Sequence, residues 1–269
     1  MTAFAEPAPA KLNLALHVRG RLPDGRHALE TLFAFCCDGD RVEGDAAGDL
    51  RLAIDGPFAG DLDAGDDNLV IRAARALAEV AQVPAKAALR LTKTLPVASG
   101  IGGGSADAAA TLRLLTRLWR IDPAHAAAVA PGLGSDVPAC LLSMTARGEG
   151  AGDALQLVDD PAISGTPVLL VNPGVALSTG AVFVRWDGVD RGPLGDCRQG
   201  RNDLEPAARA LAPVIGDVLD WLGEREGAAF VRMSGSGATC FALFDSEDLR
   251  DVAAAAVPSG WWHLATTLR

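Results

Sequence analysis

Hydrophobic residues alternate with other residue types near the amino terminus, between Lys11 and Arg19. The apolar positions of this segment are Leu12, Leu14, Leu16 and Val18. A period of two predicts a strand with one buried face, and it puts Lys11, Asn13 and His17 together on the opposite face. Residues 22–27 have a Pro-Asp-Gly composition typical of a chain reversal, and the apolar run over 31–37 predicts the returning strand.

Apolar residues spaced by three and four positions predict helices farther along the chain. We expect helices over residues 68–80, 105–119, 123–130, 178–184, 203–222 and 247–257, and another that opens near 132–138. We expect strands over residues 50–54, 88–93, 154–158, 167–172 and 262–268, and a glycine turn between two apolar stretches over 231–244. Residues 38–66 are rich in Gly, Asp and Ala and predict turns and edge strands. Together these elements indicate an α+β fold.

Length and composition narrow the class of protein. A chain of 269 residues suits two domains, and the polar stretch near 155–165 predicts the divisions 1–158 and 159–269. A net charge of −10 argues against nucleic acid or anionic membrane as a partner, and no obligate protein partner is implied. The five scattered cysteines, the missing leader pattern and the missing long apolar run predict a cytoplasmic protein with reduced thiols.

A glycine-rich segment runs from Pro96 to Ala106, ahead of the helix predicted over 105–119. Glycine lets backbone N–H groups approach a ligand without a Cβ, and the start of a helix carries partial positive charge, so the segment is a candidate anion site. Neither a Walker pattern nor a dinucleotide-binding context is present. A linker or a simple helix cap is the alternative. Asp107 is expected in the first helical turn as a capping carboxylate.

Other polar and aromatic residues have ordinary interpretations when each is taken alone. Asp136 precedes Val-Pro and could cap a helix, and Lys11 could be a solvated lysine on a strand. His27 lies at the end of a turn and could be a surface residue, and Phe183 could belong to the core side of a helix. Ser234–Gly237 could be a hairpin turn between two strands.

Five segments, in this order along the chain, resemble the GHMP kinases, the superfamily of galactokinase, homoserine kinase and mevalonate kinase. They are Ala10-Lys-Leu-Asn-Leu14, Asp24-Gly-Arg-His27, Pro96–Ala109, Gly134-Ser-Asp-Val-Pro138 and Met233-Ser-Gly-Ser-Gly237. Three consecutive glycines make the chain most similar to the branch that phosphorylates the 2-hydroxyl of 4-diphosphocytidyl-2-C-methyl-D-erythritol in the non-mevalonate isoprenoid precursor pathway. Asn172-Pro-Gly-Val175 and Asn202-Asp-Leu-Glu205 extend the resemblance into the second half.

The resemblance implies a two-domain GHMP kinase fold with the active site in the cleft between the domains. It implies ATP as co-substrate, Mg²⁺, and a small substrate that carries a cytidine diphosphate group, but it identifies no metal ligand. Asp136 is the implied general base and Lys11 its electrostatic partner. The implied ATP-binding residues are Pro96, Val97, Ala98, Ser99, Gly100, Ile101, Gly102, Gly103, Gly104, Ser105 and Ala106. The implied substrate-binding residues are Asn13, Arg26, His27, Asp136, Thr179 and Phe183, with the cytosine between the rings of His27 and Phe183.

Two positions depart from the family pattern. Arg26 stands where relatives often have tyrosine, and Ala106 stands where a second serine is commoner, which removes one hydroxyl that could meet phosphate or metal. Two other functions stay open: a GHMP kinase for a different alcohol, such as homoserine or mevalonate, and a non-catalytic nucleotide-binding protein. The presence of both Lys11 and Asp136 favours catalysis.

Overall fold

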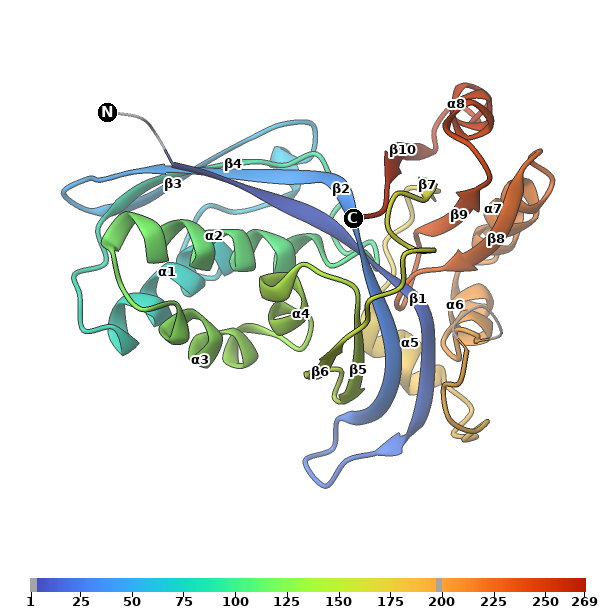
Figure 1. Cartoon of the computed structure of the whole chain (residues 1–269), viewed down its shortest axis with the longest axis horizontal. Coiled ribbons are helices and arrows are strands. Elements are labelled where there is room, and N and C mark those ends of the chain that lie inside the picture. Colours follow the sequence, from blue (N-terminus) through green and yellow to red (C-terminus); the bar gives the residue numbers. More distant parts are fainter. Residues whose placement is uncertain (1–3, 197–199) are drawn as a thin grey trace. The chain divides into compact units, whose positions relative to one another are not determined.

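The structure is a computed structural model that describes residues 4–196 and 200–269 (Figure 1). Contacts divide the chain into two compact units that interleave along the sequence. The first unit comprises the described residues up to Ala10, together with Asp38–Val97 and Gly102–Ser143; the second comprises Lys11–Cys37, Ala98–Ile101 and Met144–Arg269. The predicted domains 1–158 and 159–269 are each one continuous stretch of sequence, whereas the compact units are each built from several stretches. The division into these two domains stays a prediction.

The first unit packs helices against strands. Its strands are the second half of β2 (His27–Asp45), β3 (Leu50–Asp55) and β4 (Ala87–Thr92). β4 pairs antiparallel with β2, where Arg41 lies opposite Thr92, and parallel with β3, where Leu50 lies opposite Ala87. The helices of this unit are α1 (Leu69–Val80), α2 (Gly103–Trp119), α3 (Pro123–Leu133) and α4 (Val137–Leu142), with a short 3-10 turn, η1 (Ala59–Asp61).

Local sequence explains where these helices begin. The Asn68 side chain accepts a hydrogen bond from the Val70 N–H and starts α1. Asp122 does the same for the Ala124 N–H at the start of α3, where Pro123 is the first helical residue. The apolar stripes predicted from the sequence are buried, as in Leu77 of α1 and Leu112 of α2, so the helices gain stability by packing.

The second unit contains two groups of strands. β1 (Phe4–Arg21), whose residues up to Ala10 belong to the first unit, pairs with β2. The first half of β2 pairs antiparallel with β5 (Ala146–Gly150), and β5 pairs with β6 (Ala154–Leu157). A separate four-stranded sheet has the order β10-β7-β9-β8, with neighbours antiparallel. Its strands are β7 (Pro167–Asn172), β8 (Ala228–Met233), β9 (Cys240–Phe244) and β10 (Trp262–Thr267).

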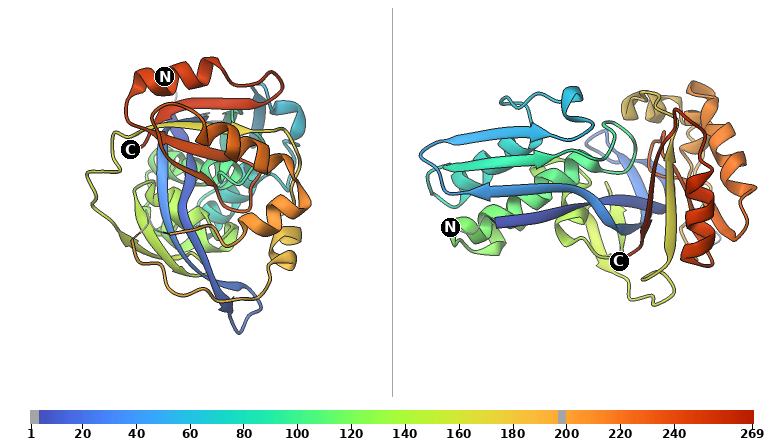
Figure 2. Two further views of the ribbon diagram at one scale, coloured as in Figure 1. Left: turned by 90° about the vertical axis from the view of Figure 1, so that its right-hand side faces the viewer. Right: turned by 90° about the horizontal axis from the view of Figure 1, so that it is seen from above.

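Helices cover one face of the four-stranded sheet (Figure 2). The helices of this unit are α5 (Thr179–Arg185), α6 (Glu205–Leu211), α7 (Val214–Gly223) and α8 (Glu247–Ala255). α7 packs on β8 and β9, whereas α8 packs on β7, β9 and β10. The core between them is built from aliphatic side chains such as Leu169, Val171, Ile215, Val218 and Leu222. Pro206 and Pro213 lie at helix starts, so the predicted break of the helical segment into α6 and α7 is confirmed.

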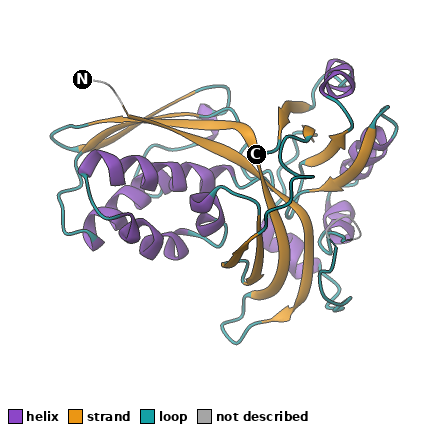
Figure 3. Ribbon diagram, in the orientation of Figure 1, coloured by secondary structure: helices purple, strands orange, loops and turns teal. Residues whose placement is uncertain are grey.

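The α+β prediction is confirmed, as the mixture of helices and strands in Figure 3 shows. The prediction was wrong for part of residues 38–66, because β2 continues as a strand to Asp45. β5 was not predicted. No helix within residues 4–196 and 200–269 is long and apolar enough to cross a lipid bilayer. Cys36, Cys37, Cys140 and Cys240 form no disulfide, and Cys197 lies outside the described residues.

Candidate active site

Lys11 is held in a fixed position on β1. Its ammonium donates a hydrogen bond of 2.8 Å to Oδ1 of Asn13, and it lies 5.7 Å from the centre of the Phe33 ring. The Asn13 amide in turn donates to Oγ1 of Thr31 at 2.8 Å, and Thr31 donates to the Ala15 carbonyl. Lys11 and Asn13 are each only 3% exposed, so the interpretation of Lys11 as a solvated strand lysine was wrong.

Within the second unit, the loop 234–237 packs against Gly100 of the glycine-rich segment from Pro96 to Ala106, which we call the phosphate loop. Oγ of Ser234 donates to the Gly100 carbonyl at 3.0 Å and accepts from the Asn13 N–H. Gly100 has φ +79°, and a Cβ there would lie 2.5 Å from the Ser234 carbonyl oxygen. The Lys11 N–H also donates to the Ile101 carbonyl at 2.9 Å. These hydrogen bonds connect three segments to one another: β1 at Lys11 and Asn13, the phosphate loop at residues 100–101, and the loop 234–237.

The remainder of the phosphate loop begins α2 in the first unit. Gly102 is the N-cap residue with φ 66°, and the helix starts at Gly103 with no side-chain cap. Its first N–H groups are therefore available to an anion, as the sequence predicts. The Ala106 side chain is buried, so this position faces the protein interior. The prediction for Asp107 was wrong: it lies in the second turn, and its carboxylate pairs with Lys93.

Asp136 directly precedes α4 in the first unit. Its carbonyl accepts the Cys140 N–H, but its side chain makes no capping hydrogen bond to the helix. The capping interpretation was therefore wrong for this carboxylate. Asp136 and Lys11 belong to different compact units, and their pairing stays a prediction.

The rings of His27 and Phe183 lie directly against each other, whereas the resemblance implies a cytosine between them. Their ring centres are 4.5 Å apart with planes at 26°, and the Trp186 ring meets His27 edge-on at 5.7 Å. Burial and the neighbouring Arg21 lower the pKa of His27, which favours a neutral ring. A base between two rings needs centres about 7 Å apart, since aromatic layers stack at about 3.5 Å. The two rings would have to separate before a cytosine could lie between them.

The two other predicted substrate contacts have partners within the second unit. Nε of Arg26 donates to Asp24 at 2.8 Å, and the guanidinium also approaches Asp153. The bond to Asp24 raises the pKa of Arg26, which keeps its charge. Oγ1 of Thr179, at the start of α5, lies 2.9 Å from Oγ of Ser236, so α5 is tied to the loop 234–237.

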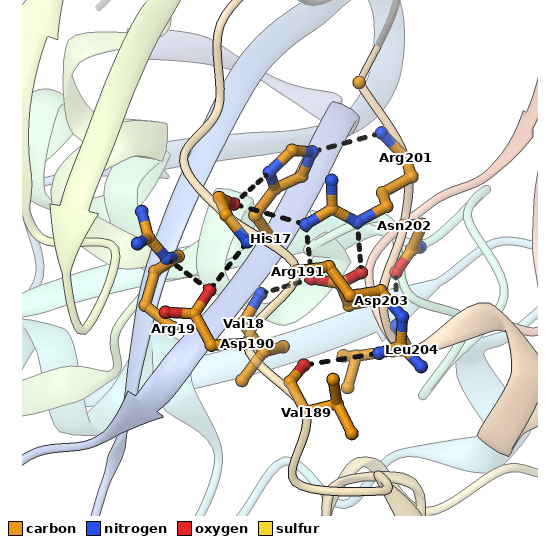
Figure 4. Close-up of polar contacts among 12 residues, drawn as sticks. His17, Val18, Arg19, Val189, Asp190, Arg191, Arg201, Asn202, Asp203 and Leu204 are labelled. Carbon is orange, nitrogen blue, oxygen red and sulfur yellow. Dashed lines mark hydrogen bonds and ion pairs between the residues drawn. The ribbon is translucent and has the colours of Figure 1, made fainter.

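His17 lies on β1, as Lys11 and Asn13 do, but its hydrogen-bond partners are different (Figure 4). Its Nε2 accepts from the Arg201 N–H at 3.2 Å, and its Nδ1 lies 3.1 Å from the Gly192 carbonyl oxygen. The Arg201 side chain forms an ion pair with Asp203. His17 therefore fastens the segment around Gly192 and Arg201 to β1, a structural role.

Sequence reasoning missed several residues that shape the site. Thr31 supports Asn13 through a single hydrogen bond, and Trp186 supports His27 through a ring contact; the sequence carries no signal for either. Among residues 4–196 and 200–269, no three His, Cys, Asp or Glu side chains cluster in a way that would hold a metal ion.

Known families match both halves of the chain. Residues 68–144 match the GHMP kinases N terminal domain, and residues 190–261 match the GHMP kinases C terminal family. The sequence is 53% identical to the 4-diphosphocytidyl-2-C-methyl-D-erythritol kinase of Rhizorhabdus wittichii, over 98% of this chain and 94% of that one. It is 49% identical to the protein of that name from Sphingopyxis alaskensis, over 97% and 96%.

Solved structures superimpose on this chain over nearly its full length. A crystal structure of 4-(cytidine 5'-diphospho)-2C-methyl-D-erythritol kinase superimposes with a TM-score of 0.85 at 33% identity, covering 98% of this chain and 99% of that one. A homoserine kinase from Cytophaga hutchinsonii superimposes with a TM-score of 0.73 at 19% identity, over 100% and 95%. At that identity the second likeness concerns the fold alone.

Proposed function

Because this chain belongs to the 4-diphosphocytidyl-2-C-methyl-D-erythritol kinase family of the GHMP kinases, we propose that it transfers the γ-phosphate of ATP to the 2-hydroxyl of that alcohol. The observation that carries the proposal is the bond between Lys11 and the phosphate loop. The Lys11 backbone is hydrogen-bonded to Ile101, and its ammonium is held by Asn13. A fixed cation beside a glycine-rich anion site suits phosphoryl transfer.

In the proposed reaction the substrate oxygen attacks the γ-phosphorus, the bond to the β–γ bridging oxygen breaks, and ADP leaves. Asp136 accepts the proton of the attacking hydroxyl, and its carboxylate is not used to cap α4. Lys11 stabilises negative charge on the transferring phosphoryl group. Phosphoryl transfer has a loose transition state, so positioning and charge compensation matter more than the basicity of Asp136.

The phosphate loop from Pro96 to Ala106 binds the triphosphate through backbone N–H groups at the start of α2. Mg²⁺ fits this site, because Ser105 offers a hydroxyl in the first turn of α2 and Mg²⁺ takes few protein ligands besides phosphates and water. When bound, Mg²⁺ would neutralise phosphate charge. The cytosine of the substrate binds between the rings of His27 and Phe183, which separate to admit it. We place the reaction in the cytoplasm.

The experiment is a coupled ADP assay of the purified protein with Mg²⁺, ATP and 4-diphosphocytidyl-2-C-methyl-D-erythritol. Asp136→Asn and Lys11→Met should each lower kcat by at least about 100-fold while circular dichroism and melting temperature stay near those of the wild type. ADP release that does not depend on the alcohol would remove the proposed reaction. Full activity of Asp136→Asn would remove only the assignment of the base.

A kinase for another alcohol of the superfamily is the alternative. The likeness to homoserine kinase supports only a shared fold. The contact between His27 and Phe183 favours a substrate with an aromatic base, since homoserine and mevalonate carry no ring that could stack there.

A further inference from the structure

Two ring nitrogens in the second unit are buried at one place and have no hydrogen-bond partner. Nε2 of His27 and Nε1 of Trp186 are both shielded from solvent, and neither has a partner among residues 4–196 and 200–269. The two rings are in contact, with centres 5.7 Å apart and planes at 85°. His27 belongs to a family segment of the sequence, but Trp186 does not. The buried indole N–H of Trp186 therefore has no explanation in the fold or in the proposed reaction.

Trp186 directly follows α5 and shares its end with Phe183. Its backbone N–H donates to the carbonyl oxygens of Val182 at 3.1 Å and Phe183 at 3.3 Å, which continues the helical pattern. Side chains three positions apart on a helix are neighbours on its surface. Phe183 stacks on the His27 ring, and Trp186 meets the same ring edge-on. The end of α5 thus places two aromatic rings around one imidazole.

The chemistry of the indole restricts the ligands that can pair with it. A buried N–H without an acceptor destabilises the protein, and buried tryptophan N–H groups usually have a partner. The indole nitrogen donates one hydrogen bond and accepts none. A ligand that pairs with it must therefore bring a carbonyl oxygen or an unprotonated ring nitrogen. An amine, a cation or an aliphatic group would leave the N–H unpaired.

A pyrimidine base has acceptors of this kind along its edge. Cytosine carries the carbonyl oxygen O2 and the unprotonated nitrogen N3, whereas its amino group is a donor. A base that stacks on His27 lies parallel to that ring, and its edge then comes to the ring that meets His27 edge-on, which is Trp186. The base and the indole N–H therefore match in chemistry and in position.

The end of α5 has room to move when the rings separate. The His27 and Phe183 rings must part by about 2.5 Å, from 4.5 Å to about 7 Å, to admit a base. A cavity of about 210 Å³ adjoins Trp186 and is also lined by residues of α6, among them Pro206 and Ala210. Residues at the end of α5 can shift into this space without displacing a packed side chain. The closed contact is therefore compatible with a state that holds a base.

We propose that Trp186 is a substrate-binding residue that donates its indole N–H to O2 or N3 of the pyrimidine, and that it thereby contributes to the selection of the base. The proposal rests on the proposed function, in which the cytosine lies between His27 and Phe183. Phe183 supplies stacking, which every base can provide, whereas the N–H of Trp186 requires an acceptor at one place. Trp186 thus adds a directional contact to a stacking site.

The first test is NMR of the indole N–H groups of the full-length protein. The probe is cytidine 5′-diphosphate (CDP), with ADP in excess so that the ATP site is occupied. The resonance of Trp186 is assigned through its own backbone among the five tryptophans, so this measurement needs no variant. A new hydrogen bond moves an N–H proton downfield, and CDP should therefore move this resonance downfield. An unchanged resonance in the CDP complex would overturn the proposal, because a tryptophan that only packs against His27 gains no acceptor.

The second test is calorimetry of CDP binding to two variants. Trp186→Phe keeps an aromatic ring against His27 and lacks the N–H, so it should bind CDP at least about fivefold more weakly than wild type. Trp261→Phe is the matched control, because Trp261 lies just before β10 and meets the Trp221 ring edge-on at 6.1 Å. It should bind CDP within about twofold of wild type. Uridine 5′-diphosphate (UDP) identifies the acceptor. A loss for CDP alone supports N3, which carries a hydrogen in uracil, and equal losses for CDP and UDP support O2.

The outcomes separate this inference from the proposed function. Equal CDP affinities of wild type and Trp186→Phe would overturn the role of the N–H. Turnover of the cytidine-diphosphate alcohol together with an unchanged Trp186 resonance would remove this inference and leave the proposed function in place. Absence of CDP binding by the wild type would instead remove the proposed cytidine site, and this inference with it.

Discussion

Lys11 and Asn13 leave the same face of β1, and a hydrogen bond of 2.8 Å joins Nζ of the lysine to Oδ1 of the asparagine. A lysine side chain has several rotatable bonds, so an ammonium with a fixed partner loses less freedom when it meets a phosphate. The amide of Asn13 is itself oriented by Thr31. The position of the Lys11 ammonium therefore depends on the side chains of Asn13 and Thr31.

Removal of the Asn13 amide should slow the reaction without preventing folding. Asn13→Ala is expected to lower kcat about 10- to 100-fold, because the Lys11 ammonium loses its hydrogen bond to Oδ1 of Asn13 and is positioned less well. Thr31→Val should have a smaller effect in the same direction, and Thr31→Ser, which keeps the hydroxyl, should restore the rate. Steady-state kinetics together with melting temperatures check this. A kcat for Asn13→Ala within twofold of wild type would contradict it.

Phe183 should control the affinity for the cytidine substrate. Phe183→Leu is expected to raise the KM for that substrate about 10-fold and to leave the KM for ATP unchanged, since base stacking contributes about 1–3 kcal/mol. Val184 is the matched control, because it is the next residue of α5 and is 81% exposed. Val184→Ala should behave as wild type. An equal change in both KM values would argue against a specific contact with the base.

Gly100 should tolerate no side chain. Gly100→Ala would put a Cβ 2.5 Å from the Ser234 carbonyl oxygen at φ +79°, so the phosphate loop and the loop 234–237 would have to move apart. The expected cost is about 1–3 kcal/mol in unfolding free energy, with reduced ATP affinity. Gly223→Ala is the control, because a Cβ there meets no atom within 4 Å. Urea unfolding and nucleotide titration measure the two effects, and equal stabilities of the two variants would refute the strain argument.

His17 should make stability depend on pH below neutrality. Burial lowers the pKa of His17 from its ordinary value of 6.5, although the bond to Gly192 acts in the opposite direction, and the Arg201 cation lowers the pKa further. A histidine with a lowered pKa stabilises the fold above pH 6.5, and this contribution is lost as the pH falls through the folded-state pKa. Wild type should therefore lose more unfolding free energy between pH 7.5 and pH 5 than His17→Gln, whose amide does not titrate. Parallel pH profiles would contradict this role.

Part of the fold could be predicted because periodicity reports burial directly. The alternation around Leu14 and the stripe through Leu112 both correspond to buried faces. The continuation of β2 could not be predicted, because Gly39 and Gly44 suggested turns. Both are glycines for reasons of packing: a Cβ on Gly39 would collide with the Ala8 carbonyl, and one on Gly44 would lie 2.8 Å from the Leu114 side chain.

The candidate site likewise contains residues that the sequence predicts and contacts that it does not predict. Motif residues such as Lys11, Asp136 and His27 are predicted from the sequence through the family resemblance, because each of them, taken alone, has an ordinary interpretation. The ion pairs of Lys93 with Asp40 and Asp107 could not be predicted, because sequence spacing does not show that these three side chains meet, and Asp107 alone suggested a helix cap. The ion pairs that bury them depend on how β2, β4 and α2 meet, which periodicity does not encode.

The most direct test of the central claim is a comparison of kcat/KM for 4-diphosphocytidyl-2-C-methyl-D-erythritol, homoserine and mevalonate, with Mg²⁺ and ATP and with the phosphorylated position of each product assigned by ³¹P–¹H NMR. We predict phosphate on the 2-hydroxyl of the cytidine-diphosphate alcohol and a preference of at least about 1000-fold over the other two alcohols. Turnover of homoserine or mevalonate at an equal or higher kcat/KM would contradict the account.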